Sequence, residues 1–341
     1  MSSGTRRAQL FPEPFAAKVP EITFLFWVIK LLTTCGGEAV SDYLALGNRQ
    51  VGAVVEAGLL VIALVWQFRT RRYVAAAYWS LAYAIAIFGT GVSDALHLFV
   101  GIPYAGTTLL WAVVLALIFW LWYRSEGTLS IHSVFTRRRE AYYWAVVFAT
   151  FALGTALGDF TASVLGLGYL ASAIMFFFII GIPAVAWWRF GLNSVVAFWF
   201  AYVVTRPLGA SFADYFGRAR SLSGIGFGSG RVAVIVTIAV AILVGYLTVT
   251  RRDIQPSRVG PAGPGTDREM APGQTRALWS ATSAGSLPKR GFCLRHRAPR
   301  LLRMTWVDRG HDQDKALGYG QAQEGHLVRA ETAALHQDQS G

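Results

Sequence analysis

Cysteine and charged residues are both scarce in this sequence of 341 residues. The two cysteines, Cys35 and Cys293, are too few for a disulfide framework or a CxxC metal site. Charged residues make up 15% of the chain, against about 25% in an average soluble protein. No Ser/His/Asp triad, phosphate-binding loop or zinc motif stands out in the apolar segments. We therefore expect neither an enzymatic activity nor a bound cofactor.

Apolar residues, by contrast, are abundant and come in long runs. Hydrophobic residues make up 54% of the chain and aromatic residues 14%. The runs are about twenty residues long, which is the length that crosses a bilayer as a helix, and they lack the strict alternation of a membrane β-barrel. The sequence therefore predicts an all-α integral membrane protein with eight transmembrane helices. Its net charge of +12 lies mainly in short connections and the tail, which favours contact with anionic lipid over nucleic acid.

A fourfold internal repeat organises the apolar part of the chain. Its signature is a tryptophan followed ten residues later by glycine and fifteen residues later by aspartate. The four copies are Trp27, Gly37 and Asp42; Trp79, Gly89 and Asp94; Trp144, Gly154 and Asp159; and Trp199, Gly209 and Asp214. Self-similarity of this kind indicates repeat architecture. We expect four tandem two-helix repeats in a pseudo-symmetric bundle about the membrane normal, with the first helix of each repeat lining the centre.

The repeat divides the chain into six parts. Residues 1–20 are a polar lead, and the four repeats span 21–72, 73–140, 141–193 and 194–250. Residues 251–341 are rich in Pro, Gly, Arg and Gln, and we expect them to form a disordered basic tail. Arg and Lys concentrate in both termini and in the connections after even-numbered spans. The positive-inside rule then places both termini in the cytoplasm.

The repeated glycines share one helix face with a small residue four positions later. Such small-xxx-small pairs let helix backbones approach closely in lipid. The glycines that we assign to helix packing are Gly37, Gly89, Gly154, Gly158 and Gly209. Packing is the expected role of these glycines, since nothing about them alone suggests chemistry.

The repeated aspartates are candidates for a functional site. Asp42, Asp94, Asp159 and Asp214 lie at the same distance from their tryptophans, so we expect them to form a ring at one depth in the membrane. In three of the repeats a second oxygen-bearing residue comes four positions earlier; these residues are Glu38, Thr90 and Thr155. Clustered oxygen atoms suit hard cations or protons. The sequence leaves the identity of any metal open.

Two basic residues inside the predicted spans, Lys30 and Arg206, require partners in a bilayer. Arg206 is eight residues before Asp214, too far along one helix for contact, so its expected partner is an acid of another repeat, with Glu38 the first choice. We assign Lys30 and Arg206 to ion pairing or gating. The alternative is that these two residues and the aspartates only lock the helices together, or that the aspartates are hydrated at the membrane interface.

The segments KVPEITFLFW, TTCGGEAVSD and RPLGASFAD, together with the pairs Tyr78-Trp79 and Tyr143-Trp144, carry a resemblance to a known family. Between about Lys18 and Thr250 the chain resembles a bacterial family of uncharacterised membrane-anchored proteins. That family is defined by four tandem repeats of unknown function, each with two transmembrane regions and a characteristic tryptophan. The resemblance implies eight spans and no established activity.

Taken together, these patterns favour transport of a small cation, either coupled to protons or a divalent metal, through the intramembrane acids. The alternative is a non-transporting membrane scaffold or sensor in which the acids only hold helices together. An intramembrane enzyme is weaker, because the spans show no nucleophile with a base. Expected partners are membrane lipid and a cation or proton, with no nucleic acid; the sequence leaves open whether the protein forms a homo-oligomer.

Overall fold

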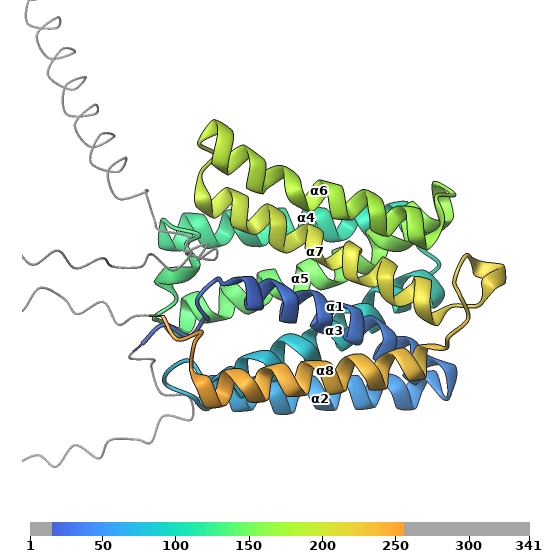
Figure 1. Ribbon diagram of the computed structural model, residues 1–341, viewed down its shortest axis with the longest axis horizontal. Coiled ribbons are helices and arrows are strands. Elements are labelled where there is room, and N and C mark those ends of the chain that lie inside the picture. Colours follow the sequence, from blue (N-terminus) through green and yellow to red (C-terminus); the bar gives the residue numbers. More distant parts are fainter. Residues whose placement is uncertain (1–15, 256–341) are drawn as a thin grey trace, which may run out of the picture. The chain divides into compact units, whose positions relative to one another are not determined.

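The computed structural model describes residues 16–255, and these form a bundle of long helices (Figure 1). The eight long helices are α1 (Phe24–Leu46), α2 (Arg49–Arg69), α3 (Ala75–Leu98), α4 (Tyr104–Glu126), α5 (Arg137–Asp159), α6 (Gly168–Phe190), α7 (Ser194–Gly217) and α8 (Ser229–Thr250). All eight are long and apolar enough to cross a membrane. The described part of the chain contains no strand. The predicted all-α architecture is therefore confirmed.

Several helices begin at a side chain that caps their free backbone N–H groups. Thr23, Asn48, Thr136 and Asn193 accept hydrogen bonds from the first turns of α1, α2, α5 and α7. α4 and α6 end at Gly127 and Gly191, both in the left-handed conformation that glycine adopts without strain. These local signals set the start and end of the spans.

The odd-numbered helices form the inside of the bundle. α1 packs against α3, α3 against α5, α5 against α7, and α7 against α1, so the four helices close into a ring. In their most apolar stretches 56–78% of the residues are buried, compared with 17–22% in the even-numbered helices. The outer helices instead expose large apolar side chains such as Leu109, Phe178 and Ile242, as helices that face lipid do. The expectation that the first helix of each repeat lines the centre is met.

Each outer helix packs mainly against the inner helix of the following repeat. α2 covers α3, α4 covers α5, and α6 covers α7. α8, which has no following repeat, returns to cover α1 (Figure 1). The repeats are therefore interlocked, because no repeat buries its inner helix with its own outer helix alone.

Four of the repeated glycines close the inner ring. Each would place an added β-carbon in collision with a residue of the next inner helix, namely Gly37 with Ala86, Gly89 with Phe151, Gly154 with Arg206, and Gly209 with Thr34. All four contacted residues stand seven positions after the tryptophan of their own repeat. Gly158 differs from these four, because an added β-carbon there would be 3.7 Å from its nearest neighbour, an ordinary van der Waals contact.

Residues on both sides of the predicted repeats also belong to the bundle. In the predicted lead, Lys18 and Val19 are buried, and the backbone N–H of Tyr73 donates to the carbonyl of Ala17. In the predicted tail, the backbone carbonyl of Asp253 accepts a hydrogen bond from Glu21. The predicted boundary at residue 140 falls inside α5, which begins at Arg137 because Thr136 caps it. The rest of the predicted tail, from residue 256, lies outside the described residues.

Candidate functional site

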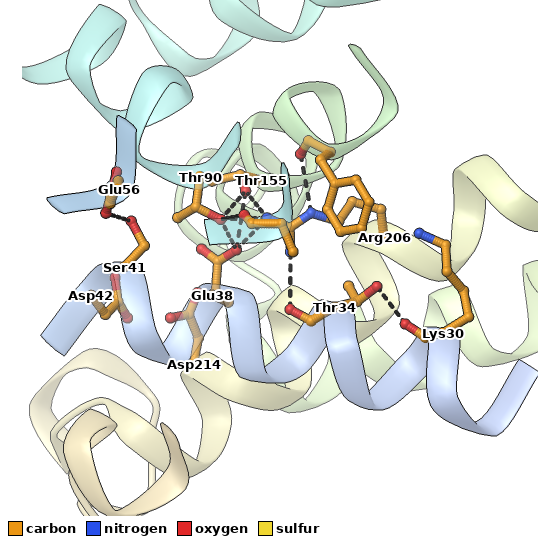
Figure 2. Close-up of polar contacts among 12 residues, drawn as sticks. Lys30, Thr34, Glu38, Ser41, Asp42, Glu56, Thr90, Thr155, Arg206 and Asp214 are labelled. Carbon is orange, nitrogen blue, oxygen red and sulfur yellow. Dashed lines mark hydrogen bonds and ion pairs between the residues drawn. The ribbon is translucent and has the colours of Figure 1, made fainter. Parts of the chain in front are cut away.

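Equivalent positions of the four repeats meet at the centre of the inner ring and form layers along the bundle axis. Seven residues after each tryptophan are Thr34, Ala86, Phe151 and Arg206; eleven residues after are Glu38, Thr90, Thr155 and Ala210; and fifteen residues after are the four aspartates. In Figure 2 the side chains of Glu38, Thr90, Thr155 and Arg206, one from each inner helix, converge on one another. Equivalent positions therefore carry different side chains in the four repeats, and the charged ones among them lie along the axis of an otherwise apolar bundle.

Arg206 lies at the middle of this axis and is fully buried. Its Nε donates to the carbonyl of Phe151 over 3.1 Å, and its Nη1 donates to the carbonyl of Thr34 over 3.3 Å. Its Nη2 donates to the hydroxyl of Thr155 over 2.7 Å and also to that of Thr90. The guanidinium group therefore contacts the three other inner helices, and only the absence of a side chain at Gly154 leaves room for its stem.

Glu38 is the charged partner of Arg206. Its Oε2 lies 2.9 Å from Nη2 of Arg206, and the same oxygen accepts hydrogen bonds from Thr90 (2.9 Å) and Thr155 (3.0 Å). Both side chains are almost completely buried. The structure therefore places these two residues as the sequence predicted, in an ion pair between different repeats. The pair is held by hydroxyl groups, which partly replace the hydration that both charges lose.

Lys30 does not follow the prediction of an ion pair. Its Nζ is buried and has no hydrogen-bond partner within residues 16–255. The ammonium group instead lies 3.9 Å from the ring centroid of Phe151 and 4.1 Å from that of Tyr202. Two aromatic faces can attract a cation. The acids are out of reach because Lys30 is two helical turns before Glu38 on α1, on the far side of Arg206 (Figure 2).

The aspartates gather at the end of the inner helices, and Arg218 contacts two of them. Nε of Arg218 lies 2.8 Å from Oδ1 of Asp214, and its Nη2 lies 3.1 Å from Oδ1 of Asp42. Arg218 immediately follows α7 and is four residues after Asp214, so the first contact is local and the second joins α7 to α1. Sequence analysis missed this role, because a loop arginine carries no signal of where its long side chain reaches.

Asp94 and Asp159 belong to the same group of acids but have no cation of their own. Within the described ranges neither carboxylate makes a hydrogen bond or an ion pair, although each interacts electrostatically with Arg218, Glu38 and Asp214. Asp159 is buried and is the last residue of α5. The chain continues from it as a π-helical turn, Phe160–Val164, a local geometry that recurs at functional sites.

The acids can be tested for their fit to a metal ion. One carboxylate oxygen from each of Glu38, Asp42 and Asp214 lies within 4.8 Å of the others. Carboxylate oxygens suit hard cations such as Mg²⁺ or Ca²⁺. Arg218 already contacts two of these three acids, so an ion bound among them competes with its guanidinium group.

Two other polar groups near the acids have structural partners. Glu56 of α2 is buried, and its Oε1 accepts a hydrogen bond from Ser41 over 2.8 Å. Gly91 leaves the space that its carboxylate fills. His97 on α3 contacts the carbonyl of Ile102 through Nδ1 and stacks on Tyr104.

A second charged cluster lies at the opposite end of the bundle. Nζ of Lys18 lies 2.6 Å from Glu140, and it donates to the carbonyl of Gln67 over 2.7 Å. Arg137 also pairs with Glu140, over 2.5 Å. Burial lowers the pKa of Lys18, Glu140 opposes this effect, and the nearby Arg137 adds to it, so that the pKa falls to about 8. The cluster ties the N-terminal segment to α2 and α5, which sequence analysis did not anticipate.

The C-terminal end of the described chain is tied down at the same end of the bundle. The hydroxyl of Tyr73 donates to Oδ2 of Asp253. Burial raises the pKa of the Asp253 carboxyl above its ordinary value. Gln255 donates to the carbonyls of Val19 and Pro20. Both ends of the described chain are therefore fastened to the start of α3 and to each other.

The fold and the charged axis together define a multi-pass helical membrane protein built from four repeats. The family model described as Repeat of Unknown Function (DUF347) matches the chain at residues 25–73, 77–128, 142–192 and 197–253. These four matches cover more than half of the chain, and the protein belongs to this repeat family. No curated protein and no solved structure matches it significantly.

Proposed function

We propose that this protein transports a small cation, either coupled to protons or a divalent metal, through the acids at the centre of its inner ring. One observation carries the proposal: five carboxylates of four inner helices lie together, and within residues 16–255 only two guanidinium groups contact them. The carboxylates are those of Glu38, Asp42, Asp94, Asp159 and Asp214, and the guanidinium groups those of Arg206 and Arg218. Uncompensated carboxylates inside a membrane are costly unless a cation or proton neutralises them.

The layers along the bundle axis differ between its two ends, and this difference bears on how a cation would reach the acids. Asp42 and Asp94 are only partly buried, so the acids are accessible from the end of the bundle at which the odd-numbered helices finish. Toward the other end, Arg206 and Lys30 place positive charge on the axis, and an aromatic layer follows in which Phe26, Trp79 and Phe198 pack together. In this conformation a cation reaches the acids from one side and meets a positively charged barrier on the other.

The distribution of basic residues supports an orientation for the proposed transport. Arg71, Arg72, Arg138, Arg189 and Arg252 lie in or beside the connections at the end where the described chain begins and finishes. The positive-inside rule assigns this end to the cytoplasm. The acids then lie toward the outer side of the membrane, and both termini are cytoplasmic. A bacterial inner membrane is the setting that the family resemblance favours.

Ion flux in proteoliposomes tests the proposal. Dye readouts for protons and for a panel of monovalent and divalent cations compare the wild type with Asp94→Asn and Asp159→Asn. These two acids make no hydrogen bond or ion pair among the described residues, so replacing either with asparagine breaks no such contact. We expect both variants to fold and to lose flux. Flux retained in both folded variants would exclude an essential role for these acids.

A scaffold or sensor function is the second candidate, and the Arg206–Glu38 network favours it. Every donor nitrogen of Arg206 has an acceptor, and Oε2 of Glu38 accepts from three groups, as in a fold-locking network. Under this alternative, no ion moves through the folded wild type, and Asp94→Asn and Asp159→Asn change only its thermal stability. The same liposome experiment therefore separates the two functions.

A further inference from the structure

Arg218 differs from the other buried cations of the bundle in its exposure and its position. Its side chain is 30% exposed, whereas that of Arg206 is 0% exposed. It stands in the connection after α7, at the end where the acids are accessible, and its guanidinium lies 5.9 Å from the ring of Tyr169. Arg218 therefore occupies the solvent-accessible edge of the acid group, while Arg206 closes the inner side.

The backbone of Arg218 is held in place, so its side chain can move alone. Its N–H donates to the carbonyl of Asp214 over 2.9 Å, and its own carbonyl accepts from Gly226 over 2.8 Å. Rotation about the side-chain bonds is thus enough to carry the guanidinium group away from Asp42 and Asp214. No helix has to shift for the two carboxylates to be released.

The symmetry of the repeats shows that this cation is an addition to one repeat. Four residues after each repeated aspartate stand Leu46, Leu98, Ser163 and Arg218. The acids are present in all four repeats, but a positive side chain at this position is present only in the last. The layer of four equivalent aspartates therefore has one arginine beside it, Arg218, which contacts two of the four.

We propose that the guanidinium group of Arg218 is a tethered competitor that occupies the cation-binding position between Asp42 and Asp214, and that an incoming cation displaces it. Two observations support a binding position there. Asp42 and Asp214 hold a cationic group in the structure, and the neighbouring Asp159 is buried and makes no hydrogen bond or ion pair among the described residues. The expected ligand is a small cation that carboxylate oxygens can coordinate, or one that donates N–H hydrogen bonds to them.

This inference rests on the proposed function for its biological meaning, because displacement of Arg218 would then be the step that admits the transported ion. The binding position itself does not depend on transport. Arg218 would set the apparent affinity, since an ion must compete with a side chain that is always present at the site. Removing the side chain should therefore strengthen cation binding without any change in the acids.

Rescue by free guanidinium tests the inference in purified, detergent-solubilised protein. We compare melting temperatures of the wild type, Arg218→Ala and Arg231→Ala with guanidinium chloride or tetramethylammonium chloride at equal concentrations of a few tens of millimolar. Arg231 is the matched control, because it is an exposed arginine near the same end whose guanidinium group lies over the ring of Phe227 and forms no ion pair among the described residues. We expect guanidinium to raise the melting temperature of Arg218→Ala relative to the other two proteins.

The double variant Arg218→Ala/Asp214→Asn should lose this rescue, since one of the two carboxylates that would bind guanidinium is gone. Equal responses of the wild type and Arg218→Ala would overturn the inference. If Arg218→Ala does not fold, Arg218→Gln replaces it, and the same difference in response decides. Flux adds a second readout: where the wild type transports an ion, Arg218→Ala should show a several-fold lower KM for it. Guanidinium rescue without any wild-type flux would retain the binding position and reject the transport function.

Discussion

The side chain of Arg206 crosses α5 directly over Gly154, so that a β-carbon on this glycine would overlap the aliphatic stem of the arginine. The same relation recurs around the ring, where three other glycines meet the residue at the equivalent position of the next repeat. The repeated glycines and the buried charge are therefore linked, because the glycines allow the close packing of the inner helices that brings Arg206 to the axis.

Gly89→Ala should destabilise the protein, whereas Gly158→Ala should not. A β-carbon at Gly89 would lie 2.9 Å from Cβ of Phe151 and 3.4 Å from the backbone of Ala152, so the helices must separate. Overpacking of this kind costs about 1–3 kcal/mol. Gly158 has ordinary contact distances, and alanine also favours the helix. Thermal unfolding in one detergent checks the pair; similar losses in both variants would contradict the ring of glycine contacts.

Removing one member of the Arg206–Glu38 pair should cost more stability than removing both. Arg206→Met leaves Glu38 buried without its cation, and a buried pair broken in this way typically loses about 3–5 kcal/mol. The double variant Arg206→Met/Glu38→Met removes both charges, so we expect it to recover part of that loss. A double-mutant cycle of unfolding free energies measures the coupling. Additive losses would show that the two side chains act independently.

Lys30→Met should raise the melting temperature. Methionine retains the length of the lysine side chain and contact with Phe151 and Tyr202, and it removes a buried amine that has no hydrogen-bond acceptor in the described part of the chain. An unsatisfied buried polar group typically costs about 1–3 kcal/mol, and more when it is charged, and the guanidinium group of Arg206 adds repulsion between like charges. Lys30→Arg serves as a comparison that keeps the charge. A lower melting temperature for Lys30→Met would mean that attraction of the ammonium group to the rings of Phe151 and Tyr202 outweighs the cost of burying it.

The stability of the wild type should rise with pH between about 8 and 10.5 relative to Lys18→Met. The pKa of Lys18 is about 8 in the folded protein and 10.5 in the unfolded chain, so the unfolded chain binds more protons throughout this interval. The free energy of unfolding then increases with pH, by up to about 1.4 kcal/mol for each pH unit. Melting curves at a series of pH values check this. Parallel pH profiles for the two proteins would show that Lys18 keeps an ordinary pKa.

Sequence patterns predicted the helices and the inner ring because both depend on local composition. Apolar runs set the spans, and the repeated Trp, Gly and Asp marked the buried faces of the odd-numbered helices. The pairing of Arg206 with Glu38 was also predictable, since helix geometry excluded Asp214 and a buried guanidinium requires an acid. These inferences used only distances along one helix and the cost of charge in a membrane.

The remaining features depend on contacts that the sequence does not encode locally. The outer helices are apolar on most faces, so nothing in their pattern shows that each covers the next repeat. The reach of Arg218 and the aromatic surroundings of Lys30 depend on how neighbouring helices are rotated. The fastening of Lys18 and Asp253 joins segments at the two ends of the described chain, which no periodic signal connects.

The covering of α1 by α8 has a consequence for synthesis. As the chain is made from its N-terminus, α3, α5 and α7 each follow a helix that is already available to cover them. α1 is the first helix to be made and receives its cover last. The nascent protein therefore passes through an open stage in which Gly36 and Ala39 of α1 lack their partners Val236 and Ala233 on α8. A ribosome that stalls before α8 would leave a chain that holds all four inner helices but exposes the face of α1 that α8 covers in the finished bundle.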